Sequence, residues 1–270
     1  MGLASLARKV KQEMKEQNKS YEERFLETVD QFIVQSRGGE KHSLLAFHPS
    51  SFYKCGRAVY YELKGFPKKE KIYARSQRIL EVGTALHEWV QRKVFMQMDL
   101  LPDAPIKLIP VKELPPYGKE GIEFITDHAA PDMEIKFIDS RWTLKFPISG
   151  MVDGALHFMD RDFIFEFKTI NPNDFEYLNA PLKEHLKQGA LYCLCLNLPV
   201  MFVYFCKGTQ NWKAFFQEYN NDQINWVKNR LSEIENCVLS SSLPPPEKNS
   251  RACSFCGYKS YCDKEIAVAA

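Results

Sequence analysis

The sequence has no apolar run of the roughly 20 residues that a membrane-spanning helix requires. Its beginning, Met1–Gln17, has no apolar core of the kind found in a secretory signal. It also has no strong excess of charge, because 36 Lys and Arg residues balance 34 Asp and Glu residues to a net +2. From these absences we expect a cytoplasmic protein without membrane contact, in which any affinity for a polyanion comes from a local patch.

No internal repeat is present, and the composition is neither that of a disordered chain nor that of a coiled coil. With 45% hydrophobic and 26% charged residues, the 270-residue chain is long enough for one large domain or two small ones. A disulfide framework is not expected, because the eight cysteines are unevenly spaced in a chain of this size. We expect reduced thiols or metal ligands instead.

The first half of the chain has helical periodicity. Residues 1–36 predict two amphipathic helices that end at Gly38–Gly39. A third helix is expected from Ser50 to Gly65, with Cys55 on its first turns, because Ser is a good N-cap and Gly ends helices. Residues 73–98 place Gly83 and His87 among apolar residues along one face, which predicts a long and mostly buried helix.

The second half changes to the alternating pattern of strands. An edge strand fits KLIPVKEL, and the segments that read as antiparallel strands are GIEFITDHA, MEIKFID, RWTLKFPISGMVDGALHFM and DFIFEFKTI, with a turn at residues 160–162. A helix opened by Pro181 should follow, then strands in VMFVYFCKG and WKAFFQEY and a last helix over residues 222–238. The Pro-rich segment 240–246 leads to a cysteine-rich tail that is too short to fold alone.

Three charged residues are expected at one position on this sheet. Glu166 and Lys168 share a strand face, since residues i and i+2 point the same way, and a hairpin would bring Asp153 beside them. Two carboxylates suit Mg²⁺ or Mn²⁺, and a lysine beside the metal can orient or help deprotonate an attacking water. The alternative is a solvated hairpin face, because outward charged positions are common in antiparallel sheets.

An Asp followed some dozen residues later by E-x-K across a strand turn resembles the PD-(D/E)XK nuclease superfamily. Two further elements strengthen this resemblance: Gly83 to His87 matches the G-x-x-x-H helix of RecB-like members, and Gln188 to Tyr192 matches their Q-x-x-x-Y helix. Taken alone, His87 is more often a core histidine, and Gln188 and Tyr192 are an i, i+4 pair.

The resemblance implies an α/β, restriction-endonuclease-like core: a central mixed sheet flanked by helices, with a helical N-terminal part and a C-terminal iron–sulfur clip. It implies a metal-dependent DNA nuclease, in which Asp153, Glu166, Lys168, Gln188 and Tyr192 are catalytic residues. It further implies Mg²⁺ or Mn²⁺ ligation by His87, Asp153, Glu166 and the backbone carbonyl of Phe167. Residues 1–45 would be an N-terminal extension, and residues 46–270 the nuclease domain with a cluster-binding tail at 251–263.

The tail offers three thiols, Cys253, Cys256 and Cys262, and Cys55 is the natural fourth. Spacing alone leaves structural Zn²⁺ and an iron–sulfur cluster equally open. The arrangement of one early and three late cysteines resembles the iron–sulfur branch of RecB-like nucleases, which includes AddB-type domains and the small CRISPR-associated exonucleases. That resemblance, which spans about residues 50–262, implies a [4Fe–4S] cluster, to which we assign a structural role.

Positive charge gathers between the first cysteine and the histidine. The basic residues of this segment, interleaved with aromatic residues, are Lys64, Lys68, Lys69, Lys71, Arg75 and Arg78. Cations for phosphates and rings for bases suit a single-strand groove, although a solvated basic loop has the same composition.

The resemblance implies an exonuclease on single-stranded DNA ends, with endonuclease activity as an option, in recombination, repair, phage replication or CRISPR adaptation. A rival is a non-catalytic DNA-binding or assembly subunit that keeps the fold and holds zinc or a cluster. Loss of a catalytic residue would favour it, and none is lost in the motifs above. A zinc-stapled scaffold unrelated to nucleases would require the ordered motif matches to be coincidental.

Overall fold

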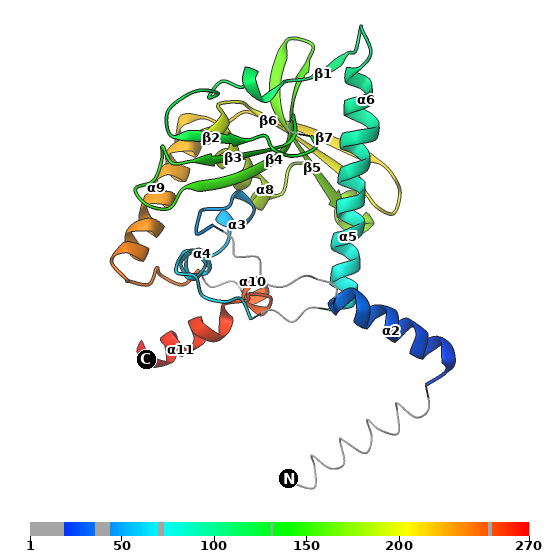
Figure 1. The fold of residues 1–270 in the computed structure, drawn as a ribbon. Helices are drawn as coiled ribbons and strands as arrows, with labels where there is room; N and C mark the ends of the chain where they lie inside the picture. The colour runs from blue at the N-terminus through cyan, green and yellow to red at the C-terminus, as the bar shows by residue number, and fades with distance from the viewer. Residues whose placement is uncertain (1–18, 36–43, 70–72, 131, 248–249, 270) are drawn as a thin grey trace. The chain divides into compact units, whose positions relative to one another are not determined.

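The computed structural model describes residues 19–35, 44–69, 73–130, 132–247 and 250–269 (Figure 1). Residue contacts divide the chain into two units, one of Met1–His42 with Lys71–Val82 and one of Ser43–Glu70 with Gly83–Ala270. The helix predicted within residues 1–18, the helix end at Gly38–Gly39 and the side chain of Lys71 lie outside the described residues. No helix among the described residues is long and apolar enough to cross a membrane.

The first unit contains α2 (Tyr21–Gln35) and the beginning of α5 (Ala74–Trp89), where Asp30 and Arg78 form an ion pair. The prediction that the second of these helices is mostly buried is wrong. No residue of α5 is fully buried, and Ile79 and Leu80 are 49% and 56% exposed. So few residues cannot enclose an apolar face, because the buried fraction of a fold falls with its size.

The second unit holds every strand described. Its remaining helical segments are α3 (Pro49–Phe52), α4 (Gly56–Leu63), the π-helix η1 (Val90–Phe95), α6 (Met96–Asp99), the 3₁₀-helix η2 (Val111–Glu113), α7 (Pro172–Glu176), α8 (Lys183–Leu196), α9 (Asn221–Leu239), α10 (Ser250–Ser254) and α11 (Lys259–Ala269). Its strands are β1 (Ile106–Leu108), β2 (Ile122–Ile125), β3 (Met133–Asp139), β4 (Ile148–Phe158), β5 (Arg161–Ile170), β6 (Val200–Cys206) and β7 (Trp212–Gln217).

These strands form one mixed sheet in the order β2-β3-β4-β5-β6-β7, and β1 pairs with the far end of β4. All pairs are antiparallel except β5 with β6, which are parallel. A parallel pair needs a long crossover connection, and here α7 and α8 provide it. The predicted central mixed sheet flanked by helices is confirmed, with β5 among its inner strands.

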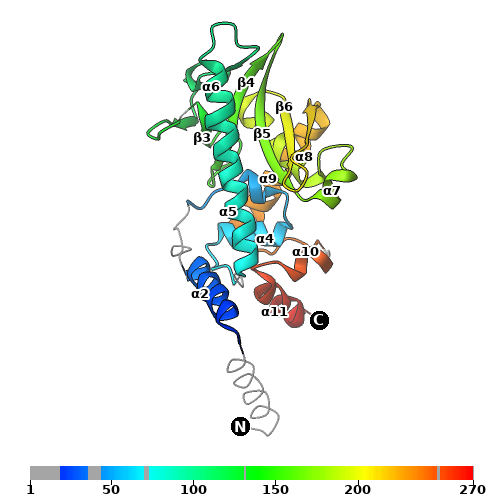
Figure 2. The same ribbon diagram turned by 90° about the vertical axis from the view of Figure 1, so that its right-hand side faces the viewer.

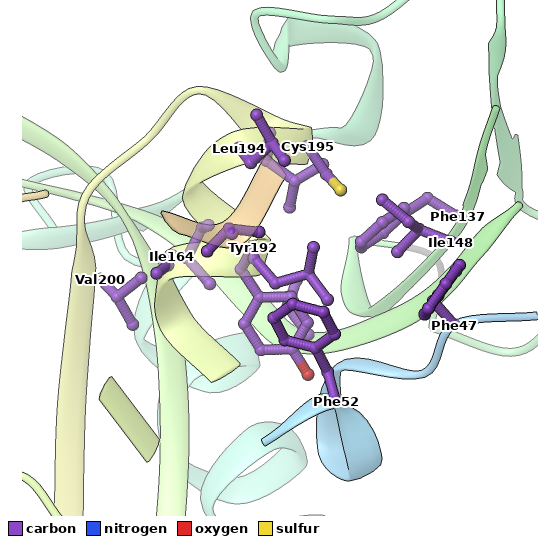
Figure 3. Packing of buried hydrophobic residues seen from close by; sticks show 14 of the residues in the cluster. Phe47, Phe52, Phe137, Ile148, Ile164, Tyr192, Leu194, Cys195 and Val200 are labelled. Atoms are coloured by element: carbon purple, nitrogen blue, oxygen red, sulfur yellow. The ribbon is translucent and has the colours of Figure 1, made fainter. Parts of the chain in front are cut away.

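Helices cover both faces of this sheet (Figure 2). The end of α5 and η1 pack through Leu86 and Val90 against Phe165 and Phe167 on one face. On the other face, α3, α4, α8 and α9 enclose the larger core. Figure 3 shows part of that core, where Tyr192 of α8 lies with Ile164 of β5 and Val200 of β6. Side chains of β5 therefore enter both cores in alternation.

Two local predictions need correction. The helix expected from Ser50 to Gly65 is two helices, α3 and α4, and Cys55 lies immediately before α4 rather than within a first turn. Gly65 does terminate the second of them, with a left-handed φ of 73° that glycine adopts without strain. The hairpin between β4 and β5 turns at residues 159–160 rather than 160–162, since Phe158 pairs with Arg161.

Candidate active site

Glu166 and Lys168 lie on β5 and point toward α8, as their spacing predicts. The Lys168 Nζ atom donates a hydrogen bond of 2.6 Å to Glu166 Oε1. Phe165 and Phe167 alternate with them and are buried on the opposite face. Strand alternation thus places two buried phenylalanines on one face of the sheet and the charged pair on the other. The solvated hairpin face considered above does not apply, because Glu166 is only 4% exposed.

Asp153 lies on β4, where the pairing of β4 with β5 stops. The ladder ends at Gly154 opposite Phe165, and the next inward N–H of β5, that of Phe167, donates to Asp153 Oδ2 at 2.7 Å instead. The N–H and C=O groups of one strand residue point to the same edge. The backbone carbonyl of Phe167 therefore faces the same side as the Asp153 carboxylate.

His87 and Gln91 hold the other oxygen of Asp153. His87 Nδ1 lies 3.0 Å from Asp153 Oδ1, and the Gln91 side-chain amide donates to the same atom at 3.3 Å. Gln91 is 4% exposed and belongs to the π-helical segment η1, a geometry that is frequent at functional sites. Sequence analysis missed Gln91, although its position four residues after His87 on a helical face was a usable signal.

Gln188 and Tyr192 of α8 continue the hydrogen-bond network from the other side of the sheet. Gln188 Oε1 accepts from Lys168 at 3.1 Å, while its Nε2 donates to Glu166 Oε1 and is 2.9 Å from the Tyr192 hydroxyl. Tyr192 donates to the backbone carbonyl of Met151 at 2.7 Å. Gly189 permits this approach of α8, because a Cβ there would lie 2.6 Å from the Phe202 ring. The structure therefore brings together all five residues predicted to be catalytic.

Burial and neighbouring charges shift the pKa values of the ionisable groups at this site. Burial raises the pKa of Glu166 above its ordinary value, although the charge of Lys168 opposes the rise. Burial lowers the pKa of His87, but the hydrogen bond and charge of Asp153 outweigh it and raise that pKa overall. Burial similarly acts to lower the pKa of Lys168, and the Glu166 charge raises it overall. The result is a group of two buried carboxylates with a partly buried imidazole and a partly buried ammonium.

The donor set can be tested for its fit to a divalent cation. Glu166 Oε2 is buried and has no hydrogen-bond partner among the described residues. An unpaired buried carboxylate oxygen is costly, and a hard cation would satisfy it. As they stand, no three His, Cys, Asp or Glu side chains in the described part of the chain are arranged to hold an ion. The residue types and the orphaned oxygen fit Mg²⁺ or Mn²⁺, while the side chains currently bond one another.

Two groups near the centre were not predicted. Burial and the charge of Glu184 raise the pKa of the Tyr53 phenol, and the Lys168 charge opposes that rise, which places Tyr53 within electrostatic range of Lys168. His185 Nδ1 lies 2.7 Å from the Tyr204 hydroxyl, and burial with the nearby Lys168 charge lowers the pKa of His185 to about 3. Neither residue belongs to a short motif, so only the fold reveals them.

A cavity of about 210 Å³ opens beside His87 and Gln91. Thr84 and Arg92 of the same helical segment and Glu134 of β3 contribute to its walls. The two residues that contact Asp153 Oδ1 therefore also line a space large enough for solvent-sized molecules.

The cysteine-rich tail docks against α4. Tyr258 and Tyr261 pack on Tyr61 with ring centroids 5.7 and 5.8 Å apart, and the Tyr261 hydroxyl donates to the carbonyl of Pro67. Upstream of the tail, the Glu247 carboxylate accepts from the backbone N–H of Gly56 at 2.9 Å. The expected fastening of the tail is therefore partly supplied by aromatic packing and hydrogen bonds.

The four cysteines of the predicted clip lie in one neighbourhood. Burial raises the pKa of the Cys256 thiol, and the charges of Cys55, Cys253 and Cys262 add to the rise. Arg57 Nη1 lies 3.5 Å from Cys262 Sγ and places positive charge beside the thiols. Of the remaining cysteines, Cys195 and Cys206 are buried, and Cys193 and Cys237 are partly buried.

The basic residues do not form one defined surface. Lys64, Lys68 and Lys69 belong to the second unit, whereas Arg75 and Arg78 belong to the first. Lys64 donates to Ser241, Lys68 pairs with Glu62 at 3.1 Å, and Lys69 lies over the Tyr261 ring. Their role in DNA binding stays a prediction.

No protein-family model matches the chain, and no curated protein sequence does. Among solved structures, the chain resembles SSO0001, with a TM-score of 0.48 and 12% identity over 88% of this chain and 96% of that one. It also resembles LHK-Exo solved in complex with dAMP, with a TM-score of 0.41 and 12% identity over 84% of this chain and 96% of that one. With TM-scores below 0.5, these likenesses are too distant to assign a function.

Proposed function

We propose that this protein is a metal-dependent nuclease that hydrolyses phosphodiester bonds of DNA. The observation that carries the proposal is the orphaned Glu166 Oε2 atom, buried next to a second carboxylate and a lysine. A divalent cation would satisfy this oxygen, because carboxylates are preferred ligands of Mg²⁺ and Mn²⁺. The ordered motifs in the sequence independently favour the same chemistry.

The cation would be held by His87, Asp153, Glu166 and the backbone carbonyl of Phe167. When bound, Mg²⁺ or Mn²⁺ supplies Lewis-acid stabilisation of the charge that builds on the scissile phosphate. His87 and Gln91 fix the orientation of the Asp153 carboxylate from one side, and the Phe167 N–H fixes it from the other.

Lys168 would orient the attacking water through its Nζ atom. That atom is itself fixed by two acceptors, Glu166 Oε1 and Gln188 Oε1. Tyr192 anchors Gln188 by joining it to the carbonyl of Met151 on β4. Gln188 and Tyr192 are therefore positioning residues for Lys168 in this scheme, and β4, β5 and α8 provide the rigid frame.

The substrate preference we propose is a single-stranded DNA end. The test is cleavage of end-labelled single and double strands with Mn²⁺, with Mg²⁺ and with a chelator. Wild-type protein should cleave only with a divalent ion, and Lys168→Ala should cleave orders of magnitude more slowly, because hydrolysis loses its water-orienting group. Lys183→Ala on the exposed end of α8 is the matched control. A folded wild-type protein that binds DNA without cleaving it would instead support the non-catalytic DNA-binding subunit.

We further propose that Cys55, Cys253, Cys256 and Cys262 hold a structural [4Fe–4S] cluster. The other three thiols lie within electrostatic range of Cys256, and the Arg57 guanidinium beside Cys262 suits a shared group with negative charge, although as they stand no three of the thiols are arranged to hold an ion. Protein purified without oxygen should be brown, whereas Zn²⁺ has a filled d shell and would leave it colourless. Cys55→Ala should lose the iron, and Cys193→Ala should retain it. Stoichiometric zinc in colourless protein would exclude the cluster but not the nuclease.

A further inference from the structure

Two exposed tryptophan side chains lie beside each other at one edge of the second unit. Trp89 ends α5 and is 41% exposed, while Trp212 begins β7 and is 45% exposed. Their ring centroids are 5.9 Å apart, with the planes inclined by 40°. Contiguous exposed apolar surface on a protein often marks a site for a ligand or partner.

The pair is supported from beneath. The Phe205 ring lies 6.0 Å from Trp89 and 4.9 Å from Trp212, and the Phe167 ring lies 5.8 Å from Trp212. Phe167 and Phe205 are themselves buried in the core on this face of the sheet. The two indoles therefore rest on a rigid base and keep their outer surfaces toward solvent.

Each of the other two tryptophans of the chain has a lysine side chain over its ring. Trp142 has Lys228 over its ring at 4.8 Å, and Trp226 has Lys187 at 5.2 Å. Among the described residues, no Lys or Arg group lies over Trp89 or Trp212. With 41% and 45% of their surfaces exposed, these two indoles leave room for contact with a ring from another molecule.

The pair is continuous with the catalytic centre. The Phe167 ring that contacts Trp212 also contacts the His87 ring, with centroids 4.9 Å apart. The Trp212 and His87 rings are thus separated by at most about 11 Å. This is roughly three steps of 3.4 Å along a B-form strand. A strand with its phosphate at His87 can present a base to Trp212 within a few nucleotides.

We propose, resting on the nuclease function above, that Trp89 and Trp212 form a stacking platform for an unpaired base of the DNA strand being cleaved. Every base has a flat π face, so such stacking tolerates any sequence. A duplex keeps its bases paired and stacked internally and offers few free faces. The platform would therefore favour single strands over duplexes.

The test measures binding with a chelator present, so that no cleavage occurs. The probes are a fluorescent oligothymidylate and a blunt duplex of the same length. Trp89→Leu should weaken single-strand binding about tenfold, in line with the loss of one stacked base, and change duplex binding little. Trp89→Phe should restore most of the loss because it keeps a ring. Trp212→Phe provides a second variant that preserves packing on Phe167.

The matched control is Tyr117→Leu. Tyr117 is 50% exposed and contacts Phe124 of β2, at the opposite edge of the sheet from β7. It should leave both affinities unchanged. Added oligothymidylate should also quench the tryptophan fluorescence of the wild type, and Trp89→Leu should reduce that quenching.

The outcomes separate this proposal from the nuclease function. If the wild type cleaves DNA but Trp89→Leu binds and is quenched like the wild type, the platform is refuted and the nuclease stands. If the wild type does not cleave DNA, but Trp89→Leu binds single strands more weakly than the wild type does, the platform stands and the nuclease fails. Equal weakening for single strands and duplexes, with no quenching, would overturn the platform and point to a protein partner for this face.

Discussion

The backbone N–H of Phe167 donates a 2.7 Å hydrogen bond to the Asp153 carboxylate, at the point where β4 and β5 cease to pair. The side chain thereby replaces a missing backbone acceptor. His87 and Gln91 of the helical layer contact the Asp153 carboxylate, whereas Gln188 of α8 forms hydrogen bonds with Glu166 and Lys168. The gap between two strands thus joins groups that come from opposite faces of the sheet.

Removing the Asp153 charge tests this junction. Asp153→Asn keeps the size, and its amide oxygen can still accept from Phe167, so we expect a folded protein, which thermal unfolding checks. Hydrolysis of end-labelled DNA should slow by orders of magnitude because one anionic metal ligand is lost. Asp162→Asn, an exposed residue of the same hairpin, should cleave at the wild-type rate. Near-normal cleavage by Asp153→Asn would refute its assignment.

Gln91 is expected to act through Asp153 rather than on substrate. Gln91→Ala should lower Mn²⁺ affinity and activity about 10- to 100-fold, the usual effect of losing a group that orients a metal ligand. Mn²⁺ binding followed by calorimetry separates this role from a general loss of structure. Gln97→Ala, on the exposed face of α6, serves as the control. Unchanged Mn²⁺ affinity in a folded Gln91→Ala protein would contradict the proposed positioning.

The basic segment should contribute affinity without sequence preference, because phosphate contacts position a strand and do not specify it. Replacing Lys68, Lys69 and Lys71 by Ala should weaken single-strand binding for all sequences alike. The slope of log affinity against log salt should fall by about 0.7 for each phosphate that the protein no longer neutralises. Fluorescence anisotropy at several salt concentrations measures both. An unaltered slope would show that DNA enters elsewhere.

Glu235 should be important for stability. This buried carboxylate of α9 accepts hydrogen bonds of 2.8, 2.7 and 3.0 Å from the backbone N–H groups of Leu144, Lys145 and Phe146. Glu235→Ala leaves three donors without their acceptor and should lower the free energy of unfolding by roughly 3 kcal/mol. Urea denaturation measures this, with the exposed Glu233→Ala of the same helix as control.

His185 should make the fold sensitive to acid. Its folded-state pKa of about 3 lies below the ordinary value of 6.5, so the unfolded chain takes up the proton more readily. The stability that neutral His185 contributes is complete above pH 6.5 and is lost as the pH falls toward 3. His185→Gln should therefore lose less stability than the wild type between pH 7 and pH 4.5. The measurement is the urea unfolding midpoint at several pH values between 7 and 4.5. Midpoints that fall equally in both proteins would contradict this role.

The sequence predicted most of what lies within strands and helices. Alternation placed Glu166 with Lys168, and helical spacing placed Gln188 with Tyr192, because both patterns depend on neighbours a few residues apart. Tyr53 and His185 were missed because their contacts join elements distant in the chain, whereas Gln91 carried a helical signal, four residues after His87, that the motifs did not include. The buried helix predicted over residues 73–98 failed for a related reason: periodicity identifies an apolar face but not whether the fold supplies a surface to cover it.

The docking of the tail on α4 affects how the protein is made. The Tyr261 hydroxyl bonds a carbonyl 194 residues earlier, and Glu247 bonds an N–H 191 residues earlier. A ribosome therefore releases α4 long before the segment that covers it has been translated, and contacts of such long sequence separation form slowly. During that interval the aromatic surface around Tyr61 stays uncovered. Premature termination upstream of the tail would leave this aromatic surface permanently exposed. We therefore expect truncated chains to be substrates for chaperones and proteases.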